Sequence, residues 1–344
     1  MSASDDAPRR PLAVTMGEPA GIGGELTLAA WMRRADLALP AFLALDDPDR
    51  LAGIARKLGW QVPIREIASA SDALTAFDDA LPVLPVRLPS PATPGRPDPA
   101  HAGAVVEALD HAVDLAMAGA VDGVVTNPIQ KKTLYDAGFP YPGHTEYLAA
   151  RCGGGMRPVM MIASPAIRVV PVTIHEALVR AVALLTPDLI VETATITAEA
   201  LHRDFGIARP RLALAGVNPH AGEDGTLGRE DIEIVAPAIE RLKAAGIDAR
   251  GPLPADTLFH EEARAGYDAV LGMYHDQVLI PAKTLDFHGG VNVTLGLPIV
   301  RTSPDHGTAL DLAGRGTARV DSLTAAIRLA GTMAAARARI SPSA

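Results

Sequence analysis

Short apolar runs alternate with longer amphipathic segments along most of the 344-residue chain. This alternation predicts an α/β fold with a largely parallel sheet. A chain of this length is long for one such domain, so we expect two α/β lobes around a central cleft. The clearest predicted strands are Leu12–Thr15, Ala41–Leu45, Val121–Thr126, Arg168–Ile174, Arg211–Ala215 and Ala269–Met273, and the clearest predicted helices are Glu25–Arg34, Asp49–Leu58, His101–Ala118, Pro187–Phe205, Arg229–Ala245 and Ser322–Ala336.

Three segments depart from this rhythm. The first eleven residues are predicted to be a polar tail. Residues 82–99 hold seven prolines, which predicts a loop or a sheet edge. Val291–Val300 is predicted to be extended. At the start of the longest helix, Thr186 is a predicted cap and Pro187 takes the first helical position.

Composition narrows the class of partner. Aromatic residues are only 4% of the chain, so Ala, Val, Leu and Ile must fill the core. The formal net charge is −9, and an acidic chain gains nothing from counterion release on a polyanion. Nucleic acid is therefore not an expected partner, although a few local Lys and Arg residues can still hold a small anion.

The compartment is indicated by what the sequence lacks. Cys152 is the single cysteine, so no internal disulfide can form, which fits a reducing cytosol. The N-terminus carries Asp5 and Asp6 where a secretory signal would be basic. No apolar run approaches the ~18 residues that a membrane span needs. We expect a cytoplasmic protein with no membrane contact.

Three histidines stand in the same context. His175, His220 and His275 each follow an apolar strand, at or just past its carboxyl end. In open α/β sheets that edge is where ligands bind. Three imidazoles suit a divalent transition metal and leave positions for substrate or water. A single histidine at a strand end is more often a packing residue, and the spacings match no short metal motif.

Two carboxylates accompany these histidines. Asp276 follows His275 directly, and Asp256 lies in a turn-rich stretch. Carboxylates near metal-bound imidazoles orient the rings or take up a proton, but Asp is also a common helix cap.

A second cluster has the chemistry of an anion site. Lys283, Asn292 and Arg301 lie within twenty residues of one another in the sequence. Residues 143–146 are predicted to open a helix, whose free N–H groups attract phosphate or carboxylate. The alternative is that these Lys and Arg side chains are simply solvated. The Gly-rich segment 18–25 is not GxGxxG, so a tight turn explains it as well as a dinucleotide site does.

At these residues the sequence resembles the 4-hydroxythreonine-4-phosphate dehydrogenase family of vitamin B6 cofactor synthesis. The similarity runs from Thr15 to about Ala330, and several long ordered matches together are highly specific. The matching stretches are Thr15–Gly23, Pro142–Glu146, Val217–Gly225, Gly251–Thr257, Met273–Gln277, Gly290–Pro298 and Arg301–Ala309.

The resemblance implies an isocitrate/isopropylmalate dehydrogenase-like fold, with residues 1–135 and 303–344 in a first, NAD-side lobe and 136–302 in a second. It implies that His175, His220 and His275 hold one divalent metal (Zn, Mg, Mn or Co), with ligands shared between the subunits of a homodimer. It implies substrate contacts from five residues: His144, Thr145, Lys283, Asn292 and Arg301. It places the adenosine of NAD or NADP on His306, Gly307, Thr308, Ala309 and Asp311.

The implied reaction is NAD-dependent oxidation of 4-phosphooxy-L-threonine, with decarboxylation of the β-keto acid product to 3-amino-2-oxopropyl phosphate. Asp256, Asp276 and Lys283 are the expected catalytic residues. Two departures from the family are Gly24, where proline is common, and the stretch 176–181 after His175. The second could alter the pocket wall and therefore the substrate.

Three other readings remain open. A paralogous dehydrogenase of a phosphorylated sugar acid or a dihydrodiol carboxylate would use the same metal and NAD. A metal-dependent lyase or aldolase would need no NAD, and the predicted adenosine segment argues against it. A non-catalytic binding module would leave the three strand-end histidines unexplained.

Overall fold

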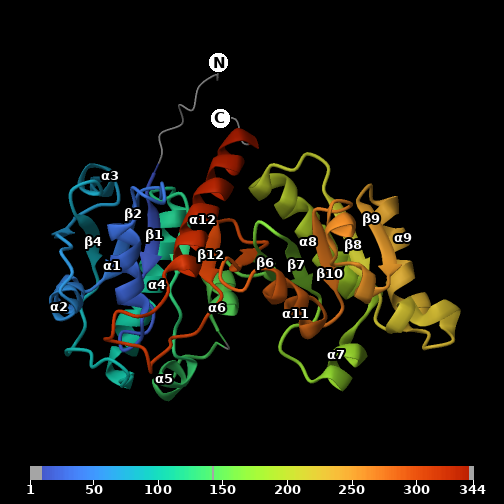
Figure 1. The fold of residues 1–344 in the computed structure, drawn as a ribbon, viewed down its shortest axis with the longest axis horizontal. Coiled ribbons are helices and arrows are strands. Elements are labelled where there is room, and N and C mark those ends of the chain that lie inside the picture. Colours follow the sequence, from blue (N-terminus) through green and yellow to red (C-terminus); the bar gives the residue numbers. More distant parts are fainter. Residues whose placement is uncertain (1–9, 142, 341–344) are drawn as a thin grey trace. The chain divides into compact units, whose positions relative to one another are not determined.

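The computed structural model describes residues 10–141 and 143–340. The chain divides into two compact units: unit 1 is Met1–Arg157 with Leu297–Ala344, and unit 2 is Pro158–Gly296 (Figure 1). The lobes expected from the sequence differ in assigning residues 136–157 and 297–302 to the second lobe. Most of the predicted polar tail (1–9) and Pro142 of one family stretch lie outside the described residues.

Unit 1 contains a parallel run of strands. Their order is β3-β4-β2-β1-β5-β12, and neighbouring strands in this order pair in parallel. The central strand β1 has four buried residues, so it is covered on both faces, as parallel strands usually are. The strands are β1 (Leu12–Thr15), β2 (Phe42–Asp46), β3 (Ile64–Glu66), β4 (Leu81–Pro85), β5 (Val124–Thr126) and β12 (Arg301–Pro304).

The helices of unit 1 begin where the sequence supplies caps. The Asp47 side chain accepts the backbone N–H of Asp49 at 2.9 Å and so caps α2, which ends at Gly59 in the left-handed region. The helices are α1 (Gly23–Met32), α2 (Pro48–Leu58), α3 (Asp72–Ala76), the short 3₁₀ turn η1 (Pro99–His101), α4 (Ala102–Met117), α5 (Lys131–Asp136), α6 (His144–Arg151) and α12 (Asp321–Ile340).

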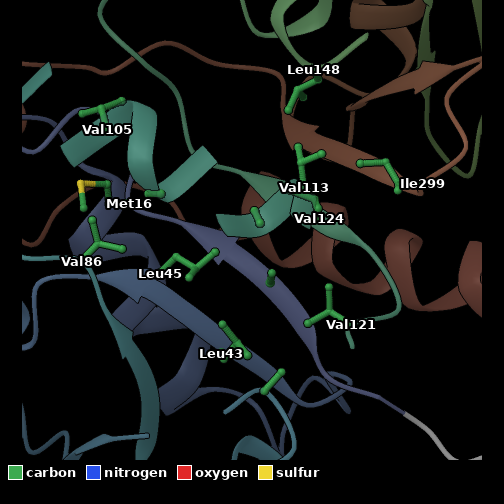
Figure 2. Packing of buried hydrophobic residues seen from close by; sticks show 14 of the residues in the cluster. Met16, Leu43, Leu45, Val86, Val105, Val113, Val121, Val124, Leu148 and Ile299 are labelled. Carbon is green, nitrogen blue, oxygen red and sulfur yellow. The ribbon is translucent and has the colours of Figure 1, made fainter. Parts of the chain in front are cut away.

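The core of unit 1 is built from small aliphatic side chains. Figure 2 shows Leu43 and Leu45 of β2, Val124 of β5 and Val105 and Val113 of α4 packed together. Leu148 of α6 joins the same cluster. Helix α6, which carries two predicted substrate residues, is therefore anchored to the sheet by burial of its own apolar face.

Unit 2 is a mixed sheet in the order β11-β6-β7-β10-β8-β9. Strand β6 is antiparallel to both β11 and β7, and the pairs β7–β10, β10–β8 and β8–β9 are parallel. The strands are β6 (Val159–Ala163), β7 (Arg168–Pro171), β8 (Arg211–Ala215), β9 (Asp248–Leu253), β10 (Ala269–Gly272) and β11 (Val291–Leu295).

The longest helix of unit 2, α8 (Pro187–Phe205), has the predicted bounds, and the Thr186 hydroxyl accepts the Leu189 N–H at 3.1 Å. The single helix predicted over Arg229–Ala245 is instead the π-helical turn η3 (Asp231–Val235) followed by α9 (Ala236–Ala244). The remaining helical elements are α7 (Leu178–Leu184), η2 (Pro219–Gly225), η4 (Ala255–Thr257), α10 (Glu261–Arg264) and α11 (His275–Leu285).

The proline-rich prediction is wrong for its first residues. Strand β4 lies between β3 and β2 and pairs with both. Alternate N–H groups of a strand point to opposite sides. The backbone nitrogen of Pro82 points towards β2, just before the ladder between β4 and β2 begins at Val83. The backbone nitrogen of Pro85 points towards β3, just beyond the last pair of the ladder between β3 and β4, Glu66 with Val83. Each proline therefore lacks its N–H where no ladder partner is required.

No single helix in the described ranges is long and apolar enough to cross a membrane. The pair α7 and α8, bent by 89°, reaches the required length and composition only when the two are taken together.

Candidate active site

The three predicted metal-ligand histidines follow three neighbouring strands of unit 2. His175 comes after β7, His275 after β10 and His220 after β8, and these strands are adjacent in the order β7-β10-β8. Because all three run parallel, their carboxyl ends lie at one edge of the sheet. The sequence placed each histidine at a strand end, and the sheet order makes those ends neighbours.

Two of these imidazoles lie close together. The ring centroids of His175 and His275 are 5.6 Å apart, with 45° between the ring planes. His275 Nδ1 is 2.7 Å from the Asp276 carboxylate, which orients the ring. In the neutral tautomer that donates through Nδ1 to this carboxylate, Nε2 carries the lone pair. The pair has the donor chemistry that a divalent transition metal takes, with an orienting carboxylate already in place.

His220 lies on an unusual turn. Residues 220–224 all have φ between +43° and +83°, and four of these five are not glycine. A left-handed conformation costs a non-glycine residue roughly 1–2 kcal/mol. Such strain persists only where the surroundings impose it, and it is typical of functional loops. Within one copy of the chain, the described residues form no group of three or more His, Cys, Asp or Glu that could hold a metal.

The other catalytic and substrate-binding residues predicted in unit 2 fall on separate elements. Asp256 is exposed in η4, a turn in contact with η2, the element that carries His220. Lys283 is partly buried on α11, with its ammonium 6.0 Å from the Phe287 ring centre. Asn292 is on β11, paired with Ile162.

In unit 1 the predicted anion residues converge on a buried arginine. Arg301 begins β12 and is 3% exposed, and its Nη2 donates to the Thr126 hydroxyl at 2.6 Å. His144 and Thr145 open α6. The His144 Nε2 atom is buried, and no hydrogen-bond partner for it occurs among the described residues. A polar atom left in that state is suited to a ligand group.

Burial shifts the pKa values of both ionisable groups at the centre of this cluster. Burial lowers the pKa of Arg301 to about 10, against the opposing influence of the Glu146 carboxylate. Burial, followed by the charges of Arg301 and Lys131, holds the pKa of His144 well below its ordinary 6.5, so the imidazole is neutral at pH 7. Both shifts oppose additional positive charge and would be relieved by a bound anion.

Lys131 is a site residue that the sequence interpretation missed. It begins α5, shortly after β5 ends, and its charge acts on His144. A Cβ atom built on Gly143 would lie 3.7 Å from the Lys131 ammonium, so this charge lies beside the start of α6. The signal available in the sequence was two successive lysines, 131 and 132, after a predicted strand.

The predicted adenosine segment follows β12 as a loop. His306 Nδ1 lies 2.9 Å from the Gly307 carbonyl oxygen, and its buried Nε2 has no hydrogen-bond partner in the part of the chain that the structure describes. Gly307 and Asp311 are exposed and Thr308 is partly buried. Ala309 has a φ of +42°, another strained residue in a loop expected to bind a ligand.

The same loop packs on the Gly-rich turn after β1. The Ile22 N–H donates to the Thr308 carbonyl at 3.1 Å, and a Cβ on Gly21 would lie 2.9 Å from that oxygen. The buried Glu25 carboxylate accepts the N–H groups of Gly314 and Gly316. Gly21 is therefore explained by close backbone approach, whether or not a dinucleotide binds nearby.

The family is decided by comparison with known proteins. The model of the family described as "Pyridoxal phosphate biosynthetic protein PdxA" matches residues 39–330. The chain belongs to the PdxA family. A 4-hydroxythreonine-4-phosphate dehydrogenase of Xanthobacter autotrophicus is 56% identical over 334 residues, which cover 96% of this chain and 95% of the relative. The family resemblance seen in the sequence is thereby confirmed.

Solved PdxA-like structures share the fold. A 4-hydroxythreonine-4-phosphate dehydrogenase from Klebsiella pneumoniae superimposes with a TM-score of 0.86 at 36% identity, covering 94% of this chain and 99% of that one. A terephthalate 1,2-cis-dihydrodiol dehydrogenase from Burkholderia xenovorans gives 0.65 at 28% identity, with 94% and 98% covered. The fold is the predicted isocitrate/isopropylmalate dehydrogenase-like α/β class.

Proposed function

We propose that this PdxA protein oxidises 4-phosphooxy-L-threonine with NAD or NADP in pyridoxal 5'-phosphate synthesis in the cytoplasm. Hydride leaves C3 for the nicotinamide, and the hydroxyl proton goes to a base. The 2-amino-3-oxo-4-phosphooxybutanoate so formed loses CO₂ to give 3-amino-2-oxopropyl phosphate. The observation that supports this substrate is the 56% identity, over 96% of the chain, to a relative named 4-hydroxythreonine-4-phosphate dehydrogenase.

The phosphate or carboxylate of this substrate would be bound by the cationic cluster of unit 1, in which Arg301 is buried and Lys131 is exposed. Arg301 supplies a planar donor set and Lys131 a second charge, while neutral His144 offers a ring nitrogen for hydrogen bonding. Thr145 adds a hydroxyl at the start of α6. Lys283 and Asn292 are the substrate contacts that the family resemblance implies for unit 2.

The histidines of unit 2 would hold a divalent cation (Zn, Mg, Mn or Co). Such a cation supplies Lewis-acid polarisation of the substrate oxygens when bound. Asp276 orients His275, since its carboxylate already pairs with Nδ1 at 2.7 Å. Asp256 and Lys283 then remain as the groups proposed to take up the hydroxyl proton.

The nicotinamide cofactor would lie along the loop after β12. His306 is suited to it because its Nδ1 is directed at a carbonyl, which leaves the buried Nε2 as an acceptor for an adenine amino or ribose hydroxyl group. Gly307, Thr308, Ala309 and Asp311 complete the proposed adenosine contacts.

A homodimer that shares the metal ligands is supported by exposed apolar side chains on the histidine-bearing elements. On α7, just after His175, Leu178 is 61% and Val179 82% exposed. On α11, which begins at His275, Ile280 is 63% exposed. A second copy covering these residues would bury apolar surface and bring its own strand-end histidines close to the His175–His275 pair.

The test is a substrate panel with purified protein. NADH formation is followed with 4-phosphooxy-L-threonine, with 4-hydroxy-L-threonine and with a terephthalate cis-dihydrodiol, each with added divalent metal. We expect turnover of the phosphorylated substrate alone, and loss of activity by orders of magnitude together with loss of bound metal in His220→Ala. Full turnover of 4-hydroxy-L-threonine would refute the proposed phosphate site.

The second candidate is a paralogous dehydrogenase acting on a dihydrodiol carboxylate. It is favoured by the structural match to the dihydrodiol dehydrogenase and by the segment after His175, which departs from the expected family continuation and forms the exposed start of α7. Turnover of the dihydrodiol in place of the phosphorylated substrate would select it. Thermal stabilisation by metal but not by NAD would instead favour a lyase.

A further inference from the structure

Past the ends of the ladders that join β7, β10 and β8, side chains connect the three chain segments that lead to the histidines. The last pairs in the parallel ladders are Gly272 with Pro171 and Leu271 with Leu214. Past these pairs the ladders no longer fix the spacing of the segments that carry His175, His275 and His220. Hydrogen bonds from Thr173, Gln277 and Asp231 span this region.

The first link joins the ends of β7 and β10. The Thr173 hydroxyl, 5% exposed, donates to the Met273 carbonyl at 2.7 Å. Thr173 lies two residues before His175, and Met273 lies two residues before His275. One buried hydrogen bond therefore ties together the backbones that present the two closely spaced imidazoles.

The second link joins the ends of β10 and β8. Gln277, in the first turn of α11, accepts the Met273 N–H at 2.7 Å through its amide oxygen. Its amide nitrogen donates to the Gly216 carbonyl at 2.6 Å. Met273 is thus held at its carbonyl by Thr173 and at its N–H by Gln277, and the same glutamine reaches the segment that leads to His220.

The third link fixes the base of the left-handed turn. The Asp231 carboxylate, in a residue 1% exposed, accepts the Val217 N–H at 2.7 Å and the Asn218 N–H at 3.1 Å. It also accepts the Asn218 side-chain amide at 3.1 Å. A strained turn such as 220–224 needs a fixed base, and a buried carboxylate with three N–H donors provides one.

We infer that Thr173, Gln277 and Asp231 are positioning residues for the metal ligands. Thr173 and Gln277 fix the backbones that carry the close His175–His275 pair. Gln277 and Asp231 fix the segment that carries His220, which in the proposed dimer would serve a shared metal site. The inference rests on the proposed metal site. A side chain that merely stabilised the fold would affect melting temperature alone. A positioning residue also changes metal affinity, because ligands held in place beforehand need no reorganisation on binding.

The test uses Co²⁺ titration of the full-length protein, followed by visible absorption, with the melting temperature measured in parallel. The variants are Thr173→Val and Gln277→Met, which keep side-chain size and delete the hydrogen bonds. The matched control is Thr197→Val, because its buried hydroxyl donates to a helix carbonyl at the same 2.7 Å but within α8. Thr173→Ser keeps the hydroxyl and serves as the rescue.

We expect Thr173→Val and Gln277→Met to weaken Co²⁺ binding about tenfold or more, with Thr197→Val and Thr173→Ser close to wild type. If Thr173→Val and Gln277→Met bind Co²⁺ as the wild type does, the inference is overturned. His275→Ala separates the two hypotheses. If His275→Ala binds Co²⁺ with wild-type affinity, the metal site itself is refuted. If His275→Ala loses Co²⁺ binding while Thr173→Val and Gln277→Met keep wild-type affinity, only the positioning role is refuted.

Discussion

Replacement of Arg301 by methionine should make the ligand-free protein more stable and abolish its response to anions. The Arg301 guanidinium is buried at the start of β12, and burial lowers its pKa from 12.5 to about 10. Methionine fills a similar volume without charge. Replacing a buried charge by an apolar side chain of similar size is often neutral or stabilising.

The magnitude follows from the pKa shift. A drop from 12.5 to about 10 is roughly 2.5 units, and at 1.36 kcal/mol per unit it corresponds to about 3 kcal/mol of destabilisation. The substitution removes this destabilisation but also removes the hydrogen bond to Thr126, which offsets about 1 kcal/mol of the stabilisation. The net effect is about 2 kcal/mol. For a unit of roughly 200 residues it would raise the melting temperature by about 4–8 °C.

The stability change predicted for Arg301→Met keeps the same sign throughout the neutral pH range. Both the native and the unfolded pKa of Arg301 lie well above 7, so the group is charged in both states and the penalty is constant there. The native pKa is the lower one, so the penalty is relieved only as the pH rises through about 10. The measurement is therefore thermal unfolding at pH 7, with and without inorganic phosphate.

Arg203→Met is the matched control in unit 2. Its guanidinium donates to the buried Asp204 carboxylate at 2.7 Å, which raises the pKa of Arg203. That substitution should lower the melting temperature, because it leaves a buried carboxylate without this partner. A decrease in melting temperature for Arg301→Met, or stabilisation of that variant by phosphate as in the wild type, would refute the reasoning.

Three further predictions concern single positions. Gly216→Ala would place a Cβ 2.8 Å from the Ala221 Cα, so we expect a loss of about 1–3 kcal/mol in urea unfolding; an unchanged midpoint would contradict it. His144 takes up a proton below about pH 6.5 in the unfolded chain, whereas its lowered pKa keeps it neutral in the native protein. The free energy of unfolding should therefore fall as the pH decreases from about 6.5 towards the native pKa. His144→Asn should flatten that dependence, and equal slopes would count against it. Thr186→Ala should cost about 1 kcal/mol through loss of the cap, measurable as a lower melting temperature.

Local patterns in the sequence were enough to predict several elements. Strands β1 and β8 and helix α8 have the bounds expected from their apolar runs, and Thr186 caps α8 as its position before Pro187 predicted. These features depend on residues close to one another in the chain. Pro82 and Pro85 misled the interpretation because proline excludes only one hydrogen bond, and whether that bond is needed depends on where neighbouring strands begin and end.

Features that join distant parts of the chain could not be predicted from the residues alone. The sequence placed three histidines at strand ends, but the order β7-β10-β8, which makes those ends neighbours, is a property of the sheet. Nothing in the local sequence pairs Asp231 with the Val217 N–H, or Lys131 with His144. Whether the three imidazoles bind one cation stays a prediction.

The anion site proposed for unit 1 and the metal site proposed for unit 2 differ in how free energy is spent before a ligand binds. In unit 1 the charge of Arg301 is buried at a free-energy cost. An anionic substrate would relieve that cost, so the buried charge would contribute to the free energy of binding. In unit 2 His175 and His220 are exposed, and the strain lies in the backbone turn at 220–224. Unit 1 should therefore respond to anions even without metal, whereas the affinity of unit 2 for metal should depend on how well its chain segments, and a second subunit, hold the imidazoles in place.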